Sequence, residues 1–302
     1  MAISLSVGSG KGGVGKSMLA ANLAILLAKA GRRVCLVDLD LGGADIHILF
    51  GMFGPAKTLS DFLQHDTVGI EELLLNVPGF DHLHILPGVS DTLQTVNMTF
   101  AEKQRLLKAL TTIDTDVLLL DIGAGVSLHT LDFFMMSELQ ICVTTPEPTA
   151  VMDFYTFLQL ATLRRAMSAF PSQDPVNQAL REHSFKSLSE VFALAEDIQK
   201  GAKAEIEAVL RFFNPLLVVN MVGAGARINL LKLGQLLKNY LGIYLPVLGE
   251  IPYDPAVSKT VCDFMPISET APNSPAGRAL AGIADKTSKV IDLCRRKRGQ
   301  TL

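Results

Sequence analysis

Eight residues near the start of the chain, Gly10 to Ser17, read G-K-G-G-V-G-K-S and constrain the fold more than any other segment. They match the phosphate-binding loop pattern G-x-x-x-x-G-K-[ST], in which glycines let backbone N–H groups wrap a phosphate chain. In this pattern Lys16 reaches the β- and γ-phosphates, and the Ser17 hydroxyl binds Mg²⁺. A glycine-rich turn without a ligand is the plain alternative.

The segments on either side of this loop favour nucleotide binding. Residues 2–7 predict a short buried strand, and residues 17–30 predict a helix whose N-terminal dipole would face the anion. We therefore expect the nucleotide to be bound by the whole loop and the first helical residue: Gly10, Lys11, Gly12, Gly13, Val14, Gly15, Lys16, Ser17 and Met18.

Strand-like segments alternate with helical ones along the rest of the chain, at residues 33–39, 82–86, 116–121, 139–144, 216–221 and 244–248. This alternation predicts an α/β fold: a doubly wound, mostly parallel sheet with helices on both faces and right-handed crossovers. The hydrophobic content of 49% supplies the large core that such a sheet needs. We expect residues 1–302 to form a single domain.

Composition disfavours several classes of function. The longest apolar runs, such as residues 19–28 and 212–221, are shorter than the roughly 20 residues of a membrane span, and no signal peptide is recognisable, so we expect a cytoplasmic protein. The net charge of −3 disfavours nucleic acid as a partner. The four cysteines include no C-x-x-C pair, and the six histidines have no metal-ligand spacing, so neither a disulfide framework nor a transition-metal site is indicated.

Carboxylates follow two of the predicted strands. Asp38 and Asp40 come at the end of 33–39, and Asp121 follows four apolar residues, the pattern of a Walker B strand. Parallel strands deliver their carboxyl ends to one edge of the sheet, where ligands bind. We expect Asp121 to hold Mg²⁺, mostly through water, with Asp38 also in the Mg²⁺ shell. Asp40 falls in the loop beyond the strand, where a mobile catalytic group belongs; a helix cap is the alternative role for Asp121 alone.

A second lysine inside the loop, Lys11, makes the sequence resemble the MinD/ParA family of P-loop ATPases, which carry this deviant Walker A motif. The resemblance implies a homodimer that encloses two ATP molecules, with Lys11 reaching the partner's nucleotide and Lys16 its own. It also implies that Asp40 orients the attacking water. We count Asp40 among the Mg²⁺-site residues as well. The alternative is a solvated Lys11 that only raises ATP affinity.

The same resemblance implies adenine contacts near the end of the chain, at Asn220, Pro252 and Asp254. An Asn side chain both donates and accepts, which suits a purine edge, although Asn and Asp also cap turns. No guanine-specifying Asn-Lys-x-Asp motif is present, since Met221 follows Asn220, and this favours ATP over GTP.

Several phrases are similar to the FlhG branch, the MinD-like regulators of flagellar number and placement. They are D-L-D-L-G-G-A-D at 38–45, D-I-G-A-G at 121–125, T-T-P-E-P-T at 144–149 and L-G-E-I-P-Y-D at 248–254. Three features depart from the branch. Asp45 stands where Asn is usual, Met1 comes directly before the first strand, without the segment that engages the GTPase FlhF, and the insertion at 167–211 is longer than the resemblance leads us to expect. We therefore expect a different protein partner.

Two segments stand outside the nucleotide-binding pattern. Residues 167–211 form a long insertion with predicted helices at 176–184 and 187–209, which is either a docking site for a protein partner or a surface decoration. The last helix, at about 275–298, ends in R-R-K-R; its apolar face predicts packing on the core with a solvated tip, and peripheral membrane contact is the alternative.

The sequence therefore predicts a dimerising molecular switch with slow Mg-ATP hydrolysis that regulates the placement or number of a cellular structure such as the flagellum or division site. One alternative is a ParA-like partition ATPase, which would hold DNA through a basic surface formed by Lys200, Lys203, Arg211 and the terminal cluster. A weaker alternative is an iron–sulfur carrier of the Mrp type, in which a dimer would bring together equivalent thiols of Cys262 or Cys294.

Overall fold

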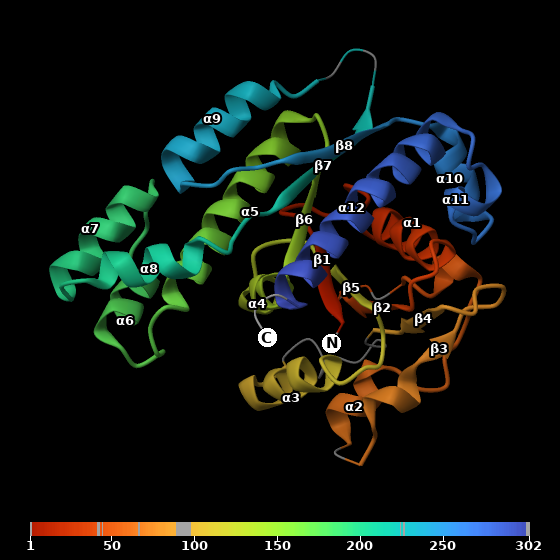
Figure 1. Ribbon diagram of the computed structural model, residues 1–302, viewed down its shortest axis with the longest axis horizontal. Helices are drawn as coiled ribbons and strands as arrows, with labels where there is room; N and C mark the ends of the chain where they lie inside the picture. Colours follow the sequence, from red (N-terminus) through yellow and green to blue (C-terminus); the bar gives the residue numbers. More distant parts are fainter. Residues whose placement is uncertain are drawn as a thin grey trace.

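An eight-stranded sheet with helices on both faces forms the body of the molecule (Figure 1). The computed structural model describes residues 2–40, 43, 45–65, 67–88, 98–223, 225 and 227–299. The strand order is β3-β4-β2-β5-β1-β6-β7-β8, and every pair is parallel except β3 with β4. The strands are β1 Ile3–Gly8, β2 Val34–Leu39, β3 Leu75–Asn76, β4 Leu83–Leu86, β5 Val117–Ile122, β6 Leu139–Thr144, β7 Leu216–Val222 and β8 Val247–Pro252. The predicted α/β class is confirmed.

Apolar residues fill both sides of the sheet, as parallel strands covered on both faces require. One core joins the sheet to α1 Lys16–Lys29, α11 Ile267–Thr270 and α12 Pro275–Gly299. The opposite core joins it to α2 Leu59–Gln64, α3 Phe100–Leu110, α4 Leu128–Met136, α5 Pro148–Met167 and α9 Leu230–Leu241. Cys35 and Cys142 are buried in strands, where burial raises the pKa of the Cys35 thiol to about 12 and also raises that of Cys142.

The predicted strands agree with the sheet except at two places. The short β3 was missed, because two residues carry no periodicity. The last strand is Val247–Pro252 rather than 244–248, so the prediction was wrong by several residues. The pattern misled because Tyr244 is exposed, whereas Leu248 and Ile251 are the buried positions.

The insertion after α5 forms a small helical lobe with its own core. It contains α6 Pro175–Glu182, α7 Leu188–Ile198 and α8 Ala202–Leu210. The predicted single helix over 187–209 was wrong, because Gly201 adopts a left-handed conformation with φ of 94° and divides it. The core of the lobe includes Ala166 and Met167 at the end of α5, and Phe170 just after it.

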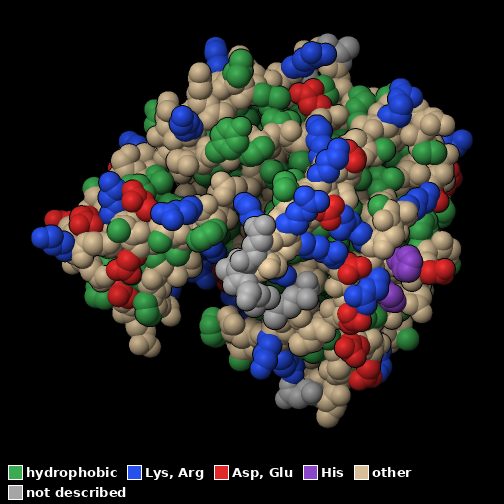
Figure 2. Space-filling model, viewed as in Figure 1, with side chains coloured by type: hydrophobic (Ala, Val, Ile, Leu, Met, Phe, Trp, Pro, Cys, Tyr) green, Lys and Arg blue, Asp and Glu red, His purple; other side chains and the backbone are tan. Residues whose placement is uncertain are grey.

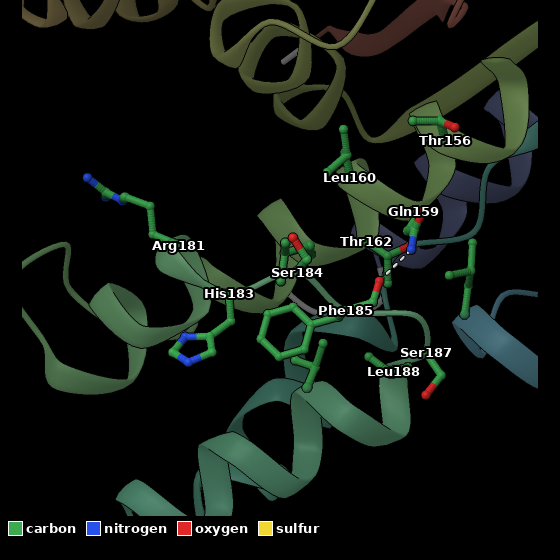
Figure 3. Close-up of a pocket in the computed structure, with 13 residues that line it drawn as sticks. Thr156, Gln159, Leu160, Thr162, Arg181, His183, Ser184, Phe185, Ser187 and Leu188 are labelled. Atoms are coloured by element: carbon green, nitrogen blue, oxygen red, sulfur yellow. Dashed lines mark hydrogen bonds between the residues drawn. The ribbon is translucent and has the colours of Figure 1, made fainter.

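A cleft of about 300 Å³ separates this lobe from the middle of α5 (Figure 3). One hydrogen bond crosses it, from Gln159 Nε2 to the carbonyl oxygen of Phe185 at 2.6 Å. His183 contacts Ala179 on the lobe through Nδ1 instead. The residues lining this cleft include none of those predicted to bind nucleotide.

The C-terminal helix packs along the sheet, as predicted, with Ile283 and Ile291 buried. Its tip is only partly solvated, because Arg295 pairs with Asp116 at 3.3 Å and Arg298 pairs with Glu138. These ion pairs bind part of the basic cluster to the protein itself, which weakens the membrane-contact alternative.

Within the described ranges, no helix is both long and apolar enough to cross a membrane. The remaining described helices are the two 3₁₀ turns η1 Ile48–Phe50 and η2 Ile70–Leu73, and α10 Pro255–Cys262.

Candidate nucleotide site

The phosphate loop runs from the end of β1 into the N-terminus of α1, as the sequence predicts. Gly13 and Gly15 have φ values of 75° and 91°, which only glycine adopts without strain. A side chain at Gly10 would also collide with the backbone, since a Cβ there would lie 2.1 Å from the carbonyl oxygen of Asp153. The glycines therefore serve both to turn the chain and to let it pack against α5.

Asn220, near the carboxyl end of β7, forms a hydrogen bond to the phosphate loop. Its Nδ2 donates to the carbonyl oxygen of Val14 at 2.9 Å, and the side chain is 2% exposed. A Cβ on Gly15 would lie 2.2 Å from the same nitrogen. The structure thus assigns Asn220 a loop-supporting contact that the sequence did not indicate; its adenine contact stays a prediction.

Lys16, Ser17 and Asp121 meet at the start of α1. Burial lowers the pKa of Lys16, while the charges of Asp121 and Asp40 act in the opposite direction. Burial raises the pKa of Asp121 to about 7, although a hydrogen bond with Ser17 and the charge of Lys16 both favour its ionised form. A buried ammonium facing carboxylates is the arrangement that an incoming polyphosphate with its metal ion would complete.

Asp38 and Asp40 have different environments although they are two residues apart. The carboxylate of Asp38 accepts hydrogen bonds from two backbone N–H groups, that of Asp40 at 3.1 Å and that of Ile46 at 3.0 Å. Burial, followed by the charge of Asp121, raises the pKa of Asp38 well above its usual value. Asp38 therefore binds the backbone of Asp40 and of Ile46, and its place in the Mg²⁺ shell stays a prediction.

Asp40 lies just beyond β2, over the loop that follows β5. A Cβ on Gly123 would be 3.1 Å from Asp40 Oδ1, so glycine permits this close approach. The same loop is tied to the phosphate loop, because the N–H of Gly125 donates to the carbonyl oxygen of Ser9 at 3.1 Å. The loop after β5 therefore lies close to Asp40 on one side and contacts Ser9, directly before the phosphate loop, on the other.

The residues present fit Mg²⁺. Oδ1 of Asp121 is buried and has no hydrogen-bond partner among the described residues, while the Ser17 hydroxyl bonds the same carboxyl group. Among the described residues no three His, Cys, Asp or Glu side chains converge to hold a metal ion. One carboxylate and one hydroxyl suit Mg²⁺, which takes most of its other ligands from phosphate and water.

Lys11 does not join Lys16. Its Nζ donates to Thr149 Oγ1 at 2.9 Å and lies 3.7 Å from Glu147 Oε2, at the start of α5. Its side chain is 38% exposed. The sequence contained these partners in the phrase 144–149, but no pattern indicated that they contact Lys11.

The predicted adenine contacts lie at the same sheet edge but have structural roles. Pro252 ends β8 instead of following it. Asp254 caps α10, accepting from the N–H of Ala256 at 3.0 Å and of Ala276 at 3.1 Å, and these bonds lower its pKa. The capping role is thus observed for Asp254, and base recognition stays a prediction. Nearby, Met221 has a positive φ of 57°, a rare conformation that the sequence did not reveal.

Comparison with known proteins agrees with this geometry. Residues 5–267 match the family model described as the CobQ/CobB/MinD/ParA nucleotide binding domain. The sequence is 28% identical to the antiactivator FleN of Pseudomonas aeruginosa over 284 residues, covering 93% of this chain and 85% of FleN. It is 33% identical over 161 residues to the flagellum site-determining protein YlxH of Helicobacter pylori, covering 52% of each.

A solved structure shows the same fold. The septum site-determining protein MinD of Pyrococcus horikoshii, complexed with Mg-ADP, superimposes with a TM-score of 0.68 at 23% identity, covering 96% of this chain and 97% of that one. The fold and the phosphate loop define a P-loop nucleotide-binding protein. More narrowly, the chain belongs to the CobQ/CobB/MinD/ParA nucleotide-binding family.

Proposed function

We propose that the protein is an ATP-dependent switch in which two nucleotide-bound copies close face to face and hydrolyse Mg-ATP slowly. The observation that carries the proposal is the position of Lys11. This lysine belongs to the phosphate loop, yet its ammonium is held at Thr149 and Glu147 and remains partly exposed. A lysine placed this way is available to a second copy of the chain.

The described residues would supply the remaining parts of such a switch. The loop N–H groups and Lys16 would hold the phosphates, and Ser17 and Asp121 would hold Mg²⁺, which neutralises charge on the phosphoryl group. Asp40 would orient the attacking water. The contacts of Asp40 with Gly123, and of Gly125 with Ser9, would pass the loss of the γ-phosphate to both loops.

The relatives support a role in the placement or number of a cellular structure. One is an antiactivator, another is named for determining the flagellum site, and the MinD structure comes from a protein named for determining the septum site. We propose that this chain regulates such a structure, the flagellum or the division site, by binding a protein partner in one nucleotide state.

The variant Lys11→Ala tests the switch. It should bind Mg-ATP with unchanged affinity, fail to dimerise, and hydrolyse ATP at least tenfold more slowly than the wild type. A matched control is Lys57→Ala, which removes an exposed lysine paired with Glu72 on another surface. If Lys11→Ala protein dimerised with ATP and hydrolysed it at the wild-type rate, the proposal would be wrong.

A further inference from the structure

A groove of about 690 Å³ lies between the insertion lobe and the lower body of the protein, bounded by α3 and α4 on one side and by α5 and α6 on the other. Figure 2 shows it as the hollow to the left of the centre, with basic side chains in the recess. Its lining includes the partly exposed Leu160 and Leu163 and the buried Leu131 and Leu180. An apolar floor of this kind can take the hydrophobic side chains of a ligand.

Three large apolar side chains stand exposed among the groove-lining residues. Phe100 is 71% exposed, Leu128 is 64% exposed and Val126 is 40% exposed. Single exposed apolar residues are ordinary on a protein surface, but three that border one groove extend its apolar floor outward. Such an extension is typical of a protein-binding groove.

The groove is basic although the chain as a whole is acidic. Its lining holds four cations and one carboxylate, a formal charge of 4 − 1 = +3, against −3 for the chain: Lys103, Arg164, Arg165, Arg181 and Asp132. Asp132 pairs with Lys103 and, at 2.7 Å, with Arg164. Arg165 and Arg181 donate hydrogen bonds to uncharged groups: Arg165 Nε to the carbonyl oxygen of Val209 at 3.1 Å, and Arg181 to Asn177 Oδ1 at 3.4 Å.

We propose that this groove binds an acidic amphipathic helix of a protein partner. The apolar face of the helix would fill the leucine-lined floor, with anchors three or four residues apart, and its carboxylates would meet Arg165 and Arg181. A nucleic acid has no apolar side chains for such a floor, and a flat lipid surface cannot enter the recess. Because α6 of the insertion forms one wall of the groove, the proposal assigns the lobe a role in binding the partner.

The position of α4 adds a connection to the nucleotide. Leu128 opens α4 shortly after Gly125, which contacts the phosphate loop through Ser9. A movement of that loop on γ-phosphate loss would shift Leu128 and one wall of the groove. This coupling rests on the proposed switch, whereas binding in the groove does not.

The test is selection from a displayed library of random 16-residue peptides on the wild-type protein in Mg-ADP. Selected peptides are then synthesised with a fluorescent label and measured by anisotropy. We expect net negative peptides with apolar residues at helical spacing. Their affinity should fall at least tenfold on Leu128→Ser and on Arg181→Glu, two exposed positions where substitution leaves the fold intact, as thermal melts would verify.

The matched apolar control is Leu231→Ser on α9, because Leu231 is 82% exposed and does not line the groove. It should bind the peptides as the wild type does. The proposal is overturned if no peptide is enriched, if enriched peptides are basic, or if Leu128→Ser binds them unchanged. Binding of phosphatidylglycerol vesicles or duplex DNA at the groove in place of peptides would also overturn it. None of these measurements depends on dimerisation or ATP hydrolysis, so the groove and the switch can fail separately.

Discussion

Two glycines with nearly the same backbone conformation, Gly15 in the phosphate loop and Gly201 in the insertion lobe, have different surroundings. Their φ values are 91° and 94°. A Cβ on Gly15 would lie 2.2 Å from Asn220 Nδ2, whereas a Cβ on Gly201 would meet nothing within 4 Å. Gly15 is required both because its backbone is left-handed and because a side chain there would collide with Asn220. Gly201 is required only for its left-handed backbone.

This difference separates a site built by close backbone approach from a lobe held together by ordinary side-chain packing. Around the phosphate loop, the backbone closely approaches segments far apart in sequence: Gly10 lies against the backbone of Asp153, and the Val14 carbonyl oxygen accepts from the Asn220 side chain. The lobe has a small apolar core of its own. We therefore expect substitutions at the nucleotide edge to affect function first, and those in the lobe to affect local stability first.

The largest effect is expected for Gly15→Ala. The new methyl group must displace Asn220 and strain the loop, so affinity for Mg-ATP should fall at least a hundredfold. Isothermal titration calorimetry measures this directly. The matched control is Gly31→Ala, which has φ of 82° and open space, and which should cost about 1 kcal/mol of stability without changing affinity. Equal losses of affinity in both variants would contradict the comparison.

An intermediate effect is expected for Asp121→Asn. Burial raises the pKa of Asp121 from 3.8 to about 7. Because the unfolded chain loses this proton at a lower pH than the folded protein does, the free energy of unfolding falls as the pH rises from about 4 to about 7. The variant removes this loss of stability. Without ligand it should melt at a higher temperature than the wild type at pH 8, with the advantage shrinking toward pH 5.

The same substitution should abolish the contribution of Mg²⁺ to ATP binding, because the carboxylate that would hold the ion is lost. Thermal melts from pH 5 to pH 8, with and without Mg-ATP, check both expectations. The control is Asp285→Asn, an exposed carboxylate on α12. A variant with a lower melting temperature than the wild type at pH 8, whose affinity for ATP still rose with Mg²⁺, would contradict this account of Asp121.

The smallest effect is expected for Gly201→Ala. With no steric conflict, the cost is the left-handed conformation alone, about 1 kcal/mol. Urea unfolding should show this loss, and affinity for Mg-ATP should match the wild type. A large fall in nucleotide affinity would show that the lobe and the nucleotide edge are coupled more tightly than their packing indicates.

The sequence predicted the parts of the molecule whose residues carry local signals. The phosphate loop, the strand that carries Asp121 near its end and the position of Asp40 beyond its strand follow from motifs and apolar runs, and the structure has the same strands. The α/β class followed from the alternation of strands and helices in the same way. No tertiary information was needed for these features.

Contacts between distant segments could not be predicted. The support of Val14 by Asn220 spans 206 residues, and that of Lys11 by Thr149 spans 138. The break at Gly201 was missed because a single glycine inside a helical pattern is tolerated and does not by itself end a helix. The sequence left the insertion as either a docking site or a surface decoration. The specific docking hypothesis came only from the groove, whose walls belong to four separate helices.

The central claim is that ATP, and not ADP, joins two copies of the chain. The most direct measurement is molar mass by light scattering for the Asp40→Ala variant, which should bind Mg-ATP and hydrolyse it too slowly to reset. The account predicts about twice the monomer mass of 32.6 kDa with Mg-ATP and the monomer mass with Mg-ADP. The same mass in both nucleotides would contradict it and indicate an oligomeric state that does not respond to the γ-phosphate.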